Sequence, residues 1–250
     1  MTILELLVAV SLISFIVLVL YKMFDQTQEQ MRRAVREVDK FESGRAAADL
    51  LKRDVAQMVP ARSLLGSAAV NYFTGTNWAA TAFGMTNNGT NVQVNTLDDV
   101  YFLAFDADAT PTNWVAVRYR VADSANPNLP VTAGLGTLYR WTTNANRFAT
   151  SFQLQAQTTN TPTRYFQRVA DNVVHLRISG ITNGVAVPPG GFLTNTELPS
   201  HVAIELGYVD AKTADRARAM GSTATITYLS TNVDSVHLFR LQIPIRNGQP

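Results

Sequence analysis

The sequence predicts an α+β protein in which one long N-terminal α-helix packs on a globular head built around an antiparallel β-sheet. Residues 1–59 read as one uninterrupted helix, the later residues alternate apolar and polar side chains in short runs, and no second helix is expected among those runs. We therefore expect two domains, a helix over residues 1–59 with 1–21 as its membrane-spanning part, and a β-rich head over 60–250.

The apolar segment comes first in the chain. Residues 6–21 read LLVAVSLISFIVLVLY and contain no charge, glycine or proline. About 20 apolar residues are enough to cross a hydrocarbon core roughly 30 Å thick. Lys22 follows at once, where its amine can reach the membrane interface. The segment predicts a membrane span, whose core-facing side chains include Leu7, Val10, Ile13, Phe15, Ile16 and Leu20.

A secretory signal peptide is the alternative interpretation of this segment. Signal peptides begin with basic residues and end at a small-residue cleavage site. Here the start is acidic, and no A-x-A-like site follows Tyr21. The helical pattern also continues past the apolar run, so the sequence favours a retained helix.

The second half of the helix is amphipathic. Between residues 22 and 59 there is no proline and one glycine, Gly44, which is the only intrinsic weak point of the helix. Apolar residues recur at helical spacing and form one stripe: Met31, Val35, Val38, Phe41, Ala48, Leu51, Val55 and Met58. The other faces carry basic and acidic residues of mixed sign, which indicates a solvated face rather than a nucleic-acid patch. Pro60 predicts the stop.

Glu5 is the one charge within the apolar start. A carboxylate inside a membrane span costs about 2.5–3.5 kcal/mol on insertion scales and indicates a functional role by default. The alternative is a position at the membrane interface, where the positive end of the helix dipole favours it. That alternative leaves open why the only charge of the span lies there.

The first 21 residues resemble the mature N-terminus of type IV pilins and type II secretion pseudopilins. That family usually begins with Phe, followed by Thr-Leu-Ile-Glu-Leu and a long apolar run. Thr2, Glu5 and Leu6 fall on the family positions, Ile3-Leu4 swaps two apolar residues, and Met1 replaces the Phe. Many members have a proline near position 22, where this chain has Lys22.

The resemblance implies processing and assembly. Met1 would be the residue exposed when a prepilin peptidase removes a short basic leader, and its amine would be methylated. Before assembly the subunit would lie in the inner membrane of a bacterium. An assembly platform would then move its helix into the core of a periplasmic or extracellular filament. There Glu5 would neutralise the N-terminal amine of a neighbouring copy or of another pilin or pseudopilin, because a buried charge needs a partner. No cofactor and no catalysed reaction are implied.

The predicted head begins at residue 60, after which charged residues become less frequent. Residues 61–96 look loop-rich, with a turn signal at Asn88-Gly89. Strand-like runs follow, with a second turn signal at Asn183-Gly184; the runs are 100–105, 114–121, 137–142, 151–155, 173–179, 202–209 and 236–245. Their succession resembles the J-type minor pseudopilin and the W-type minor pilin.

The head holds few candidates for chemistry, and no catalytic or nucleotide-binding motif occurs. The histidines are His175, His201 and His237; the first and last lie in strand patterns and are expected to be packed or surface residues. Residues 106–110 resemble the start of a calcium loop, but Pro111 and Val117 stand where an EF-hand needs Gly and Glu, so a polar loop is favoured.

Two further motifs have ordinary explanations. Asn88-Gly89-Thr90 is a glycosylation sequon that also reads as a turn. Arg118 and Arg120 beside Tyr119, with Arg140 beside Trp141, resemble a basic aromatic surface. Strand alternation explains that pattern without DNA, so no nucleic-acid partner is expected.

The leading hypothesis is a structural filament subunit. Within it, a minor subunit that sits at the tip and primes assembly competes with a subunit that repeats along the fibre. A rival of another class is a single-pass membrane-anchored binding protein that never polymerises. A third is a membrane-tethered hydrolase, whose turnover would depend on one of the three histidines.

Overall fold

The structure, a computed structural model, describes residues 3–58, 70–75, 84–87, 91–105, 114–131, 133–144, 166–187, 192–194 and 198–245. The chain forms two compact units, Met1–Ser43 and Gly44–Pro250. The division falls at Gly44, inside the first helix, so residues 44–56 of that helix belong with the C-terminal unit.

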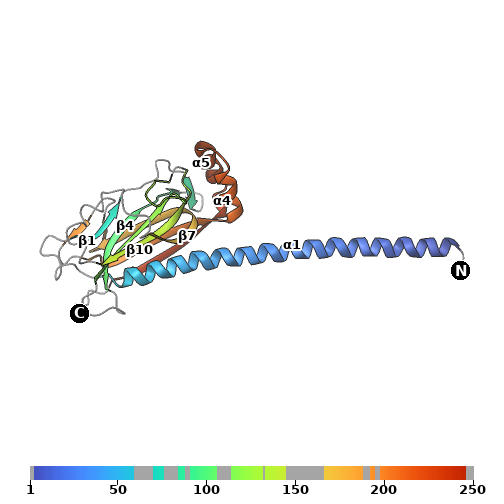
Figure 1. Ribbon diagram of the computed structural model, residues 1–250, viewed down its shortest axis with the longest axis horizontal. Helices are drawn as coiled ribbons and strands as arrows, with labels where there is room; N and C mark the ends of the chain where they lie inside the picture. The colour runs from blue at the N-terminus through green and yellow to red at the C-terminus, as the bar shows by residue number, and fades with distance from the viewer. Residues whose placement is uncertain are drawn as a thin grey trace. The chain divides into compact units, whose positions relative to one another are not determined.

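Helix α1 runs from Ile3 to Ala56 (Figure 1). It forms because no proline interrupts the sequence and one glycine alone lowers its helical propensity. Its end is a tightened turn, in which the backbone N–H groups of Gln57 and Met58 donate to the carbonyls of Asp54 and Val55 at 3.1 Å. The predicted helix end was Val59, and Pro60 lies outside the described residues.

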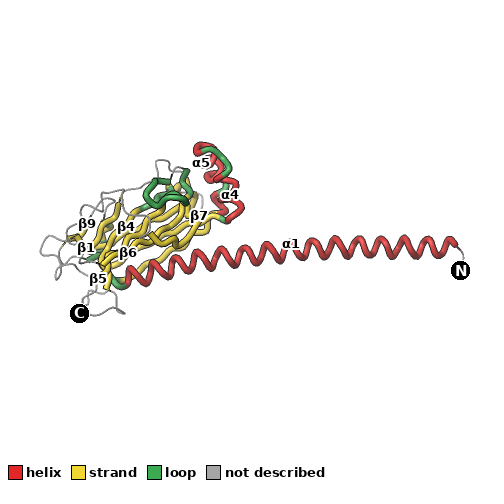
Figure 2. The backbone as a smooth tube through the Cα atoms, in the orientation of Figure 1, coloured by secondary structure: helices red, strands yellow, loops and turns green. Residues whose placement is uncertain are grey.

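Nine of the described strands form one antiparallel sheet in the order β11-β10-β7-β6-β5-β4-β1-β9, with β8 paired to β7. Figure 2 draws the strands in yellow. Their bounds are β1 Val70–Gly75, β4 Asp99–Phe105, β5 Trp114–Ala122, β6 Gly136–Asn144, β7 Phe166–Thr182, β8 Val185–Ala186, β9 Phe192–Thr194, β10 His201–Val209 and β11 Val236–Pro244. Strands β2 (Gly84–Asn87) and β3 (Asn91–Val94) form a separate antiparallel pair.

The α+β class is confirmed, and so are most of the predicted strands. Strands β4, β5, β6, β7, β10 and β11 cover the predicted runs, whereas residues 151–155 and Asn88-Gly89 lie outside the described residues. The predicted turn at Asn183-Gly184 joins β7 to β8. Its φ angles of 52° and 79° are both positive, as a tight hairpin turn requires.

The prediction of a single helix is wrong. Helices α4 (Ala211–Arg218) and α5 (Ser222–Thr231) follow β10, and a short 3₁₀ turn (Val233–Ser235) leads into β11. Asp210 caps α4, because its carboxylate accepts the N–H of Thr213 at 3.0 Å. Helix α5 is rich in Ser and Thr, which have low helix propensity, so its sequence alone gives a weak helix signal.

The reading of residues 61–96 as loop-rich is also wrong where the structure describes them, since β1, β2 and β3 lie there. These strands are short and carry Asn, Gln and Thr within them, so apolar residues do not alternate over the length that predicts a strand. Strand β1 is stabilised by its pairing with β4 and β9, because its own sequence has no clear apolar alternation.

The main core of the C-terminal unit joins residues 44–58 to one face of the sheet. Four side chains from that segment are buried in one cluster with strand residues: Ala47, Leu51, Val55 and Met58. Their partners in the cluster include Phe102, Val117, Leu138, Leu176 and Ile204. The stripe predicted from Ala48 to Met58 is thus the buried face of this segment. Met85, Val174, Val209, Ala214, Ala217 and Leu229 form a second cluster, with α4 and α5.

Gly44 lies where the helix backbone comes close to side chains of β10 and β11. A Cβ atom there would be 2.7 Å from Phe239 Cε2 and 3.2 Å from Tyr208 Cε2, and these two rings already pack edge to face. Any side chain at residue 44 would force these two rings to move. The glycine therefore allows the helix backbone to come close to them, in addition to lowering the helix propensity.

We expect Gly44→Ala to lower the free energy of unfolding by about 1–2 kcal/mol. The clash outweighs the gain in helix propensity of about 1 kcal/mol. Urea unfolding of the full chain in detergent, followed by tryptophan fluorescence, measures the change. The exposed Ala46→Gly variant gives the propensity effect alone. A Gly44→Ala protein more stable than the wild type would contradict the close-approach explanation.

Candidate functional site

The apolar segment of α1 is exposed on every side. Every side chain singled out from the sequence in this segment is between 54% and 67% exposed: Leu6, Leu7, Val10, Ile13, Phe15, Ile16 and Leu20. The helix over Leu6–Arg32 is long and apolar enough to cross a membrane, by length and composition. A helix that is apolar on all faces is stable where lipid or other protein covers it.

Two hydroxyl groups of the helix over Leu6–Arg32 bond to the preceding turn of the helix. Ser11 Oγ donates to the carbonyl of Val8 at 2.8 Å, and Thr27 Oγ1 donates to the carbonyl of Met23 at 2.8 Å. Such bonds to the preceding turn satisfy a hydroxyl within its own helix. These two polar side chains therefore add little to the cost of burying the helix.

The residues predicted to guide assembly lie at the start of α1. Met1 and Thr2 lie outside the described residues, and for Glu5 the structure describes the backbone, which is helical. Leu6 follows in the same turn. The predicted pairing of Glu5 with a neighbouring amine stays a prediction.

A buried ion pair ties the other end of α1 to the sheet. Asp54 accepts the hydroxyl of Tyr119 at 2.6 Å and the Nε and Nη2 groups of Arg140 at 2.6 and 3.2 Å. Burial, and then the charge of Asp54, raise the pKa of Tyr119. Burial alone would lower the pKa of Arg140, but its bonds to Asp54 outweigh that effect and raise it. The hydroxyl therefore stays a donor and the guanidinium stays charged.

The mixed-charge pattern of the helix predicts that its acidic residues, Asp54 among them, lie on the solvated face, and for Asp54 that prediction is wrong. The residue is 5% exposed. It lies three residues after Leu51 and one before Val55, at the edge of the apolar stripe. A carboxylate at that edge carries no local signal that Tyr119 and Arg140, from distant strands, will cover it.

A second buried charge cluster lies between β4 and β5. Arg118 binds both carboxylate oxygens of Asp99, with Nε 2.9 Å from Oδ1, and lies 4.3 Å from the ring centre of Tyr101. Arg120 Nη2 lies 3.6 Å from Asp99 Oδ2. Burial lowers the pKa of Arg120 to about 10, against the opposing charge of Asp99.

This cluster changes the interpretation of the basic aromatic pattern. Arg118 and Arg120 are buried on the face of β5 opposite Tyr119, and both guanidinium groups face a carboxylate. Arg140, the third arginine of the pattern, pairs with Asp54. The alternation predicted for this strand is confirmed, and these three arginines do not form an exposed basic surface.

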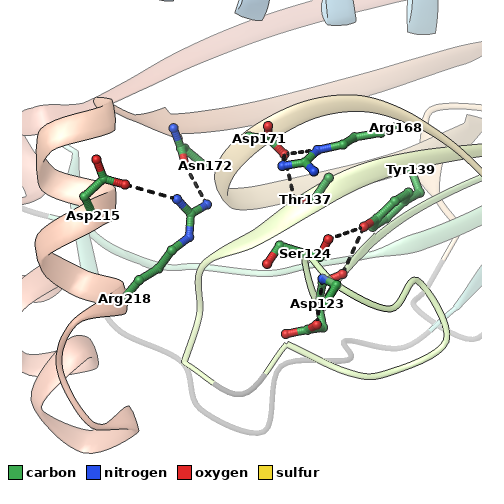
Figure 3. Close-up of polar contacts among 10 residues, drawn as sticks. Asp123, Ser124, Thr137, Tyr139, Arg168, Asp171, Asn172, Asp215 and Arg218 are labelled. Atoms are coloured by element: carbon green, nitrogen blue, oxygen red, sulfur yellow. Dashed lines mark hydrogen bonds and ion pairs between the residues drawn. The ribbon is translucent and has the colours of Figure 1, made fainter.

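Polar contacts also join α4 to β7 near Asp171 and Asn172 (Figure 3). Asp171 Oδ1 accepts from Arg168 Nε at 2.7 Å and from Thr137 Oγ1 at 2.8 Å. The next residue, Asn172, has a φ of 60° and accepts from Arg218 Nη2 at 2.7 Å. Three sequence-distant segments meet here, so sequence patterns gave no indication of the contact.

Asp98 is a buried carboxylate whose pKa is raised. Burial raises its pKa from 3.8 to about 6, although the Ile178 N–H bond and the charge of Arg177 act in the opposite direction. Above about pH 6 the folded protein buries a charge that the unfolded chain exposes to water, at a cost of up to about 3 kcal/mol. This cost decreases as the pH falls below about 6, because the folded state takes up the proton first, and it is gone below about 3.8, where the unfolded chain is protonated too.

We therefore expect Asp98→Asn to raise the free energy of unfolding by about 1–2 kcal/mol at about pH 8, and to raise it by less at about pH 4.5. The amide oxygen still accepts the Ile178 N–H. Urea unfolding at both pH values measures the difference from the wild type. Asp215→Asn, at an exposed carboxylate, is the control. A loss of stability at pH 8 would contradict the prediction.

The histidines do not gather with carboxylates into a metal site. His175 and His237 lie in β7 and β11 as predicted, and His201 is exposed at the start of β10. Among the described residues, no three His, Asp or Glu side chains could hold a metal ion together. The calcium-like run 106–110 and the sequon Asn88-Gly89-Thr90 lie outside those residues.

Comparisons with protein families, with curated proteins and with solved structures found no match for this chain. Two features of the chain therefore carry the functional argument. The first is the exposed apolar part of α1, and the second is the set of buried contacts that fix residues 44–58 to the sheet.

Proposed function

We propose that this protein is a structural subunit of a type IV pilus-like filament. The single observation that carries the proposal is the apolar part of α1, which is exposed on every face and begins with the Thr2–Glu5–Leu6 pattern of pilins and pseudopilins. Lipid covers this helix before assembly, and helices of neighbouring subunits cover it afterwards. Because both environments exclude water, one apolar surface serves both stages.

Glu5 gives the assembly its register. In lipid its carboxylate is costly, and in a filament the N-terminal amine of the next subunit neutralises it. Residues 44–58 of the same helix belong with the sheet, and the bonds of Asp54 to Tyr119 and Arg140 hold this segment to β5 and β6. The sheet then forms the outside of the filament and needs no catalytic centre for this role.

A minor subunit that primes the tip is the second candidate. The order of strand motifs from VRYRV to FRLQIPIR, which resembles J-type pseudopilins and W-type pilins, favours that role. A single-pass anchored binding protein shares the membrane stage with both. It differs in one consequence, because it never leaves the membrane.

Cell fractionation tests the proposal in two steps. We expect the chain to remain with membranes through a high-salt wash and also to occur in the filament fraction released by shearing. Ile13→Asp should lower the share of the chain in the membrane fraction, since a second carboxylate in the span costs about 2.5–3.5 kcal/mol more. Ala46→Asp places the same charge at an exposed site outside the span and should behave as the wild type. A chain confined to membranes after shearing would favour the anchored binding protein.

A further inference from the structure

The segment Asn95–Asp98, here called the connector, links β3 to β4 and lies along β7. The Leu176 N–H donates to the Thr96 carbonyl at 2.7 Å, and the Asp98 N–H donates to the Leu176 carbonyl at 2.8 Å. Leu97 and Leu176 form a parallel bridge. The connector therefore holds the β2–β3 hairpin, which precedes it, to the middle of the sheet.

Side chains supply further bonds between the connector and β7. The Thr96 N–H donates to His175 Nδ1 at 3.0 Å, and the Ile178 N–H donates to Asp98 Oδ2 at 3.0 Å. Asn95 Nδ2 donates to the Val174 carbonyl at 3.1 Å. Two of these three bonds end on a titratable group, and the bond to His175 needs an imidazole without a proton on Nδ1.

The tautomer of His175 follows from its two partners. Since Nδ1 accepts from Thr96, the proton of the neutral ring lies on Nε2, which is 3.4 Å from Glu205 Oε2. The imidazole is 0% exposed. Its strand neighbour in β10 is Gly207, where a Cβ would lie 2.9 Å from the His175 Cβ, so the glycine makes room for the histidine.

The charged groups that act on this ring come from β7, β10 and β11. Glu205 faces it from β10, and Arg240 on β11 holds Glu205 through a bond of 3.2 Å. Arg177 lies two residues along β7, and Asp98 belongs to the connector. Neither arginine can accept a hydrogen bond from the ring, and Glu205 already faces Nε2. A second proton, on Nδ1, would therefore point at the Thr96 N–H, which is also a donor.

We propose that His175 is an acid-sensitive latch, and that its protonation at Nδ1 releases the connector and the β2–β3 hairpin from β7. The imidazolium has a proton on both nitrogens and cannot accept the Thr96 N–H. Burial lowers the pKa of His175, against the effect of Glu205. The unfolded or released chain therefore binds the proton more readily, and the latch weakens as the pH falls below about 6.5.

Asp98 titrates with the opposite sign. Its raised pKa means that the folded state gains stability as the pH falls through about 6. A neutral carboxyl group still accepts the Ile178 N–H through its carbonyl oxygen. The acid response of the connector therefore belongs to His175, and removing the Asp98 charge should leave that response in place.

Amide hydrogen exchange of the full chain in detergent micelles tests the latch. After correction for the intrinsic pH dependence, we expect the Thr96, Asp98 and Leu176 amides to lose protection at least about tenfold between about pH 7.5 and about pH 5. Strand β5 should remain protected. Equal protection of the connector at both pH values would overturn the latch, and so would a loss of protection that extends to β5.

Two variants assign the response to one residue. His175→Asn places an amide oxygen near the position of Nδ1 and does not titrate, so its connector should stay protected at low pH. Asp98→Asn should keep the acid release. If His175→Asn does not fold, exchange of the C2 hydrogen of His175 in the wild type reports its pKa. A midpoint that differs from that of connector release would overturn the proposal, as would acid release in a folded His175→Asn variant.

Discussion

We expect Glu5→Ala to remain in the membrane and to be absent from filaments. The substitution removes a charge from the apolar span, so insertion becomes easier by about 2.5–3.5 kcal/mol. In the filament it leaves the N-terminal amine of a neighbouring subunit alone in an apolar core, and breaking such a pair costs about 3–5 kcal/mol. The two effects have opposite signs, so membrane content rises while filament content falls at least tenfold. Quantitative immunoblots of membrane and sheared fractions measure both.

A matched control separates this effect from a general loss of charge. Asp25→Ala removes a carboxylate from the same helix beyond the apolar run and should assemble as the wild type. Glu5→Ala subunits present in filaments at the wild-type level would show that the carboxylate has no role in assembly. That result would also remove the reason to distinguish Glu5 from an interfacial charge.

Asp54→Ala is expected to give the largest loss of stability, about 3 kcal/mol in the free energy of unfolding. The change leaves the buried Tyr119 hydroxyl and the largely buried Arg140 guanidinium without their acceptor. Removing one partner of a buried pair costs about 3–5 kcal/mol. Arg140 is 21% exposed and recovers part of this from water, so the lower end applies.

Urea unfolding of the full chain in detergent measures this loss, and two variants define its origin. Asp49→Ala removes an exposed carboxylate one turn earlier and should change stability by less than about 0.5 kcal/mol. Adding Tyr119→Phe to Asp54→Ala should restore about 1 kcal/mol, because the unpaired hydroxyl is gone. An Asp54→Ala loss below 1 kcal/mol would mean that the ion pair does not hold residues 44–58 to the sheet.

The regular elements were predictable because their signals are local. The long helix follows from the absence of proline, and strands such as β5 follow from alternation that one buried face imposes. The Asn183-Gly184 turn follows from the positive φ angles that Asn and Gly tolerate. The buried stripe from Ala48 to Met58 follows from helical spacing.

The remaining features depend on partners that are distant in sequence. Asp54 looks like any solvated acidic residue until Tyr119 and Arg140 cover it. Helices α4 and α5 have weak apolar periodicity and are fixed by packing in the cluster around Leu229. Gly44 reads as a helix weak point, whereas the rings of Tyr208 and Phe239 give its position a steric reason.

Immunogold electron microscopy of sheared filaments, with an antibody against the sheet unit, tests the central claim most directly. The filament proposal predicts gold label on fibres. Label at regular intervals identifies a repeating subunit, and label at fibre ends identifies a minor priming subunit. Fibres without label, with all of the protein in the membrane fraction, would contradict the proposal and leave a membrane-anchored protein that does not polymerise.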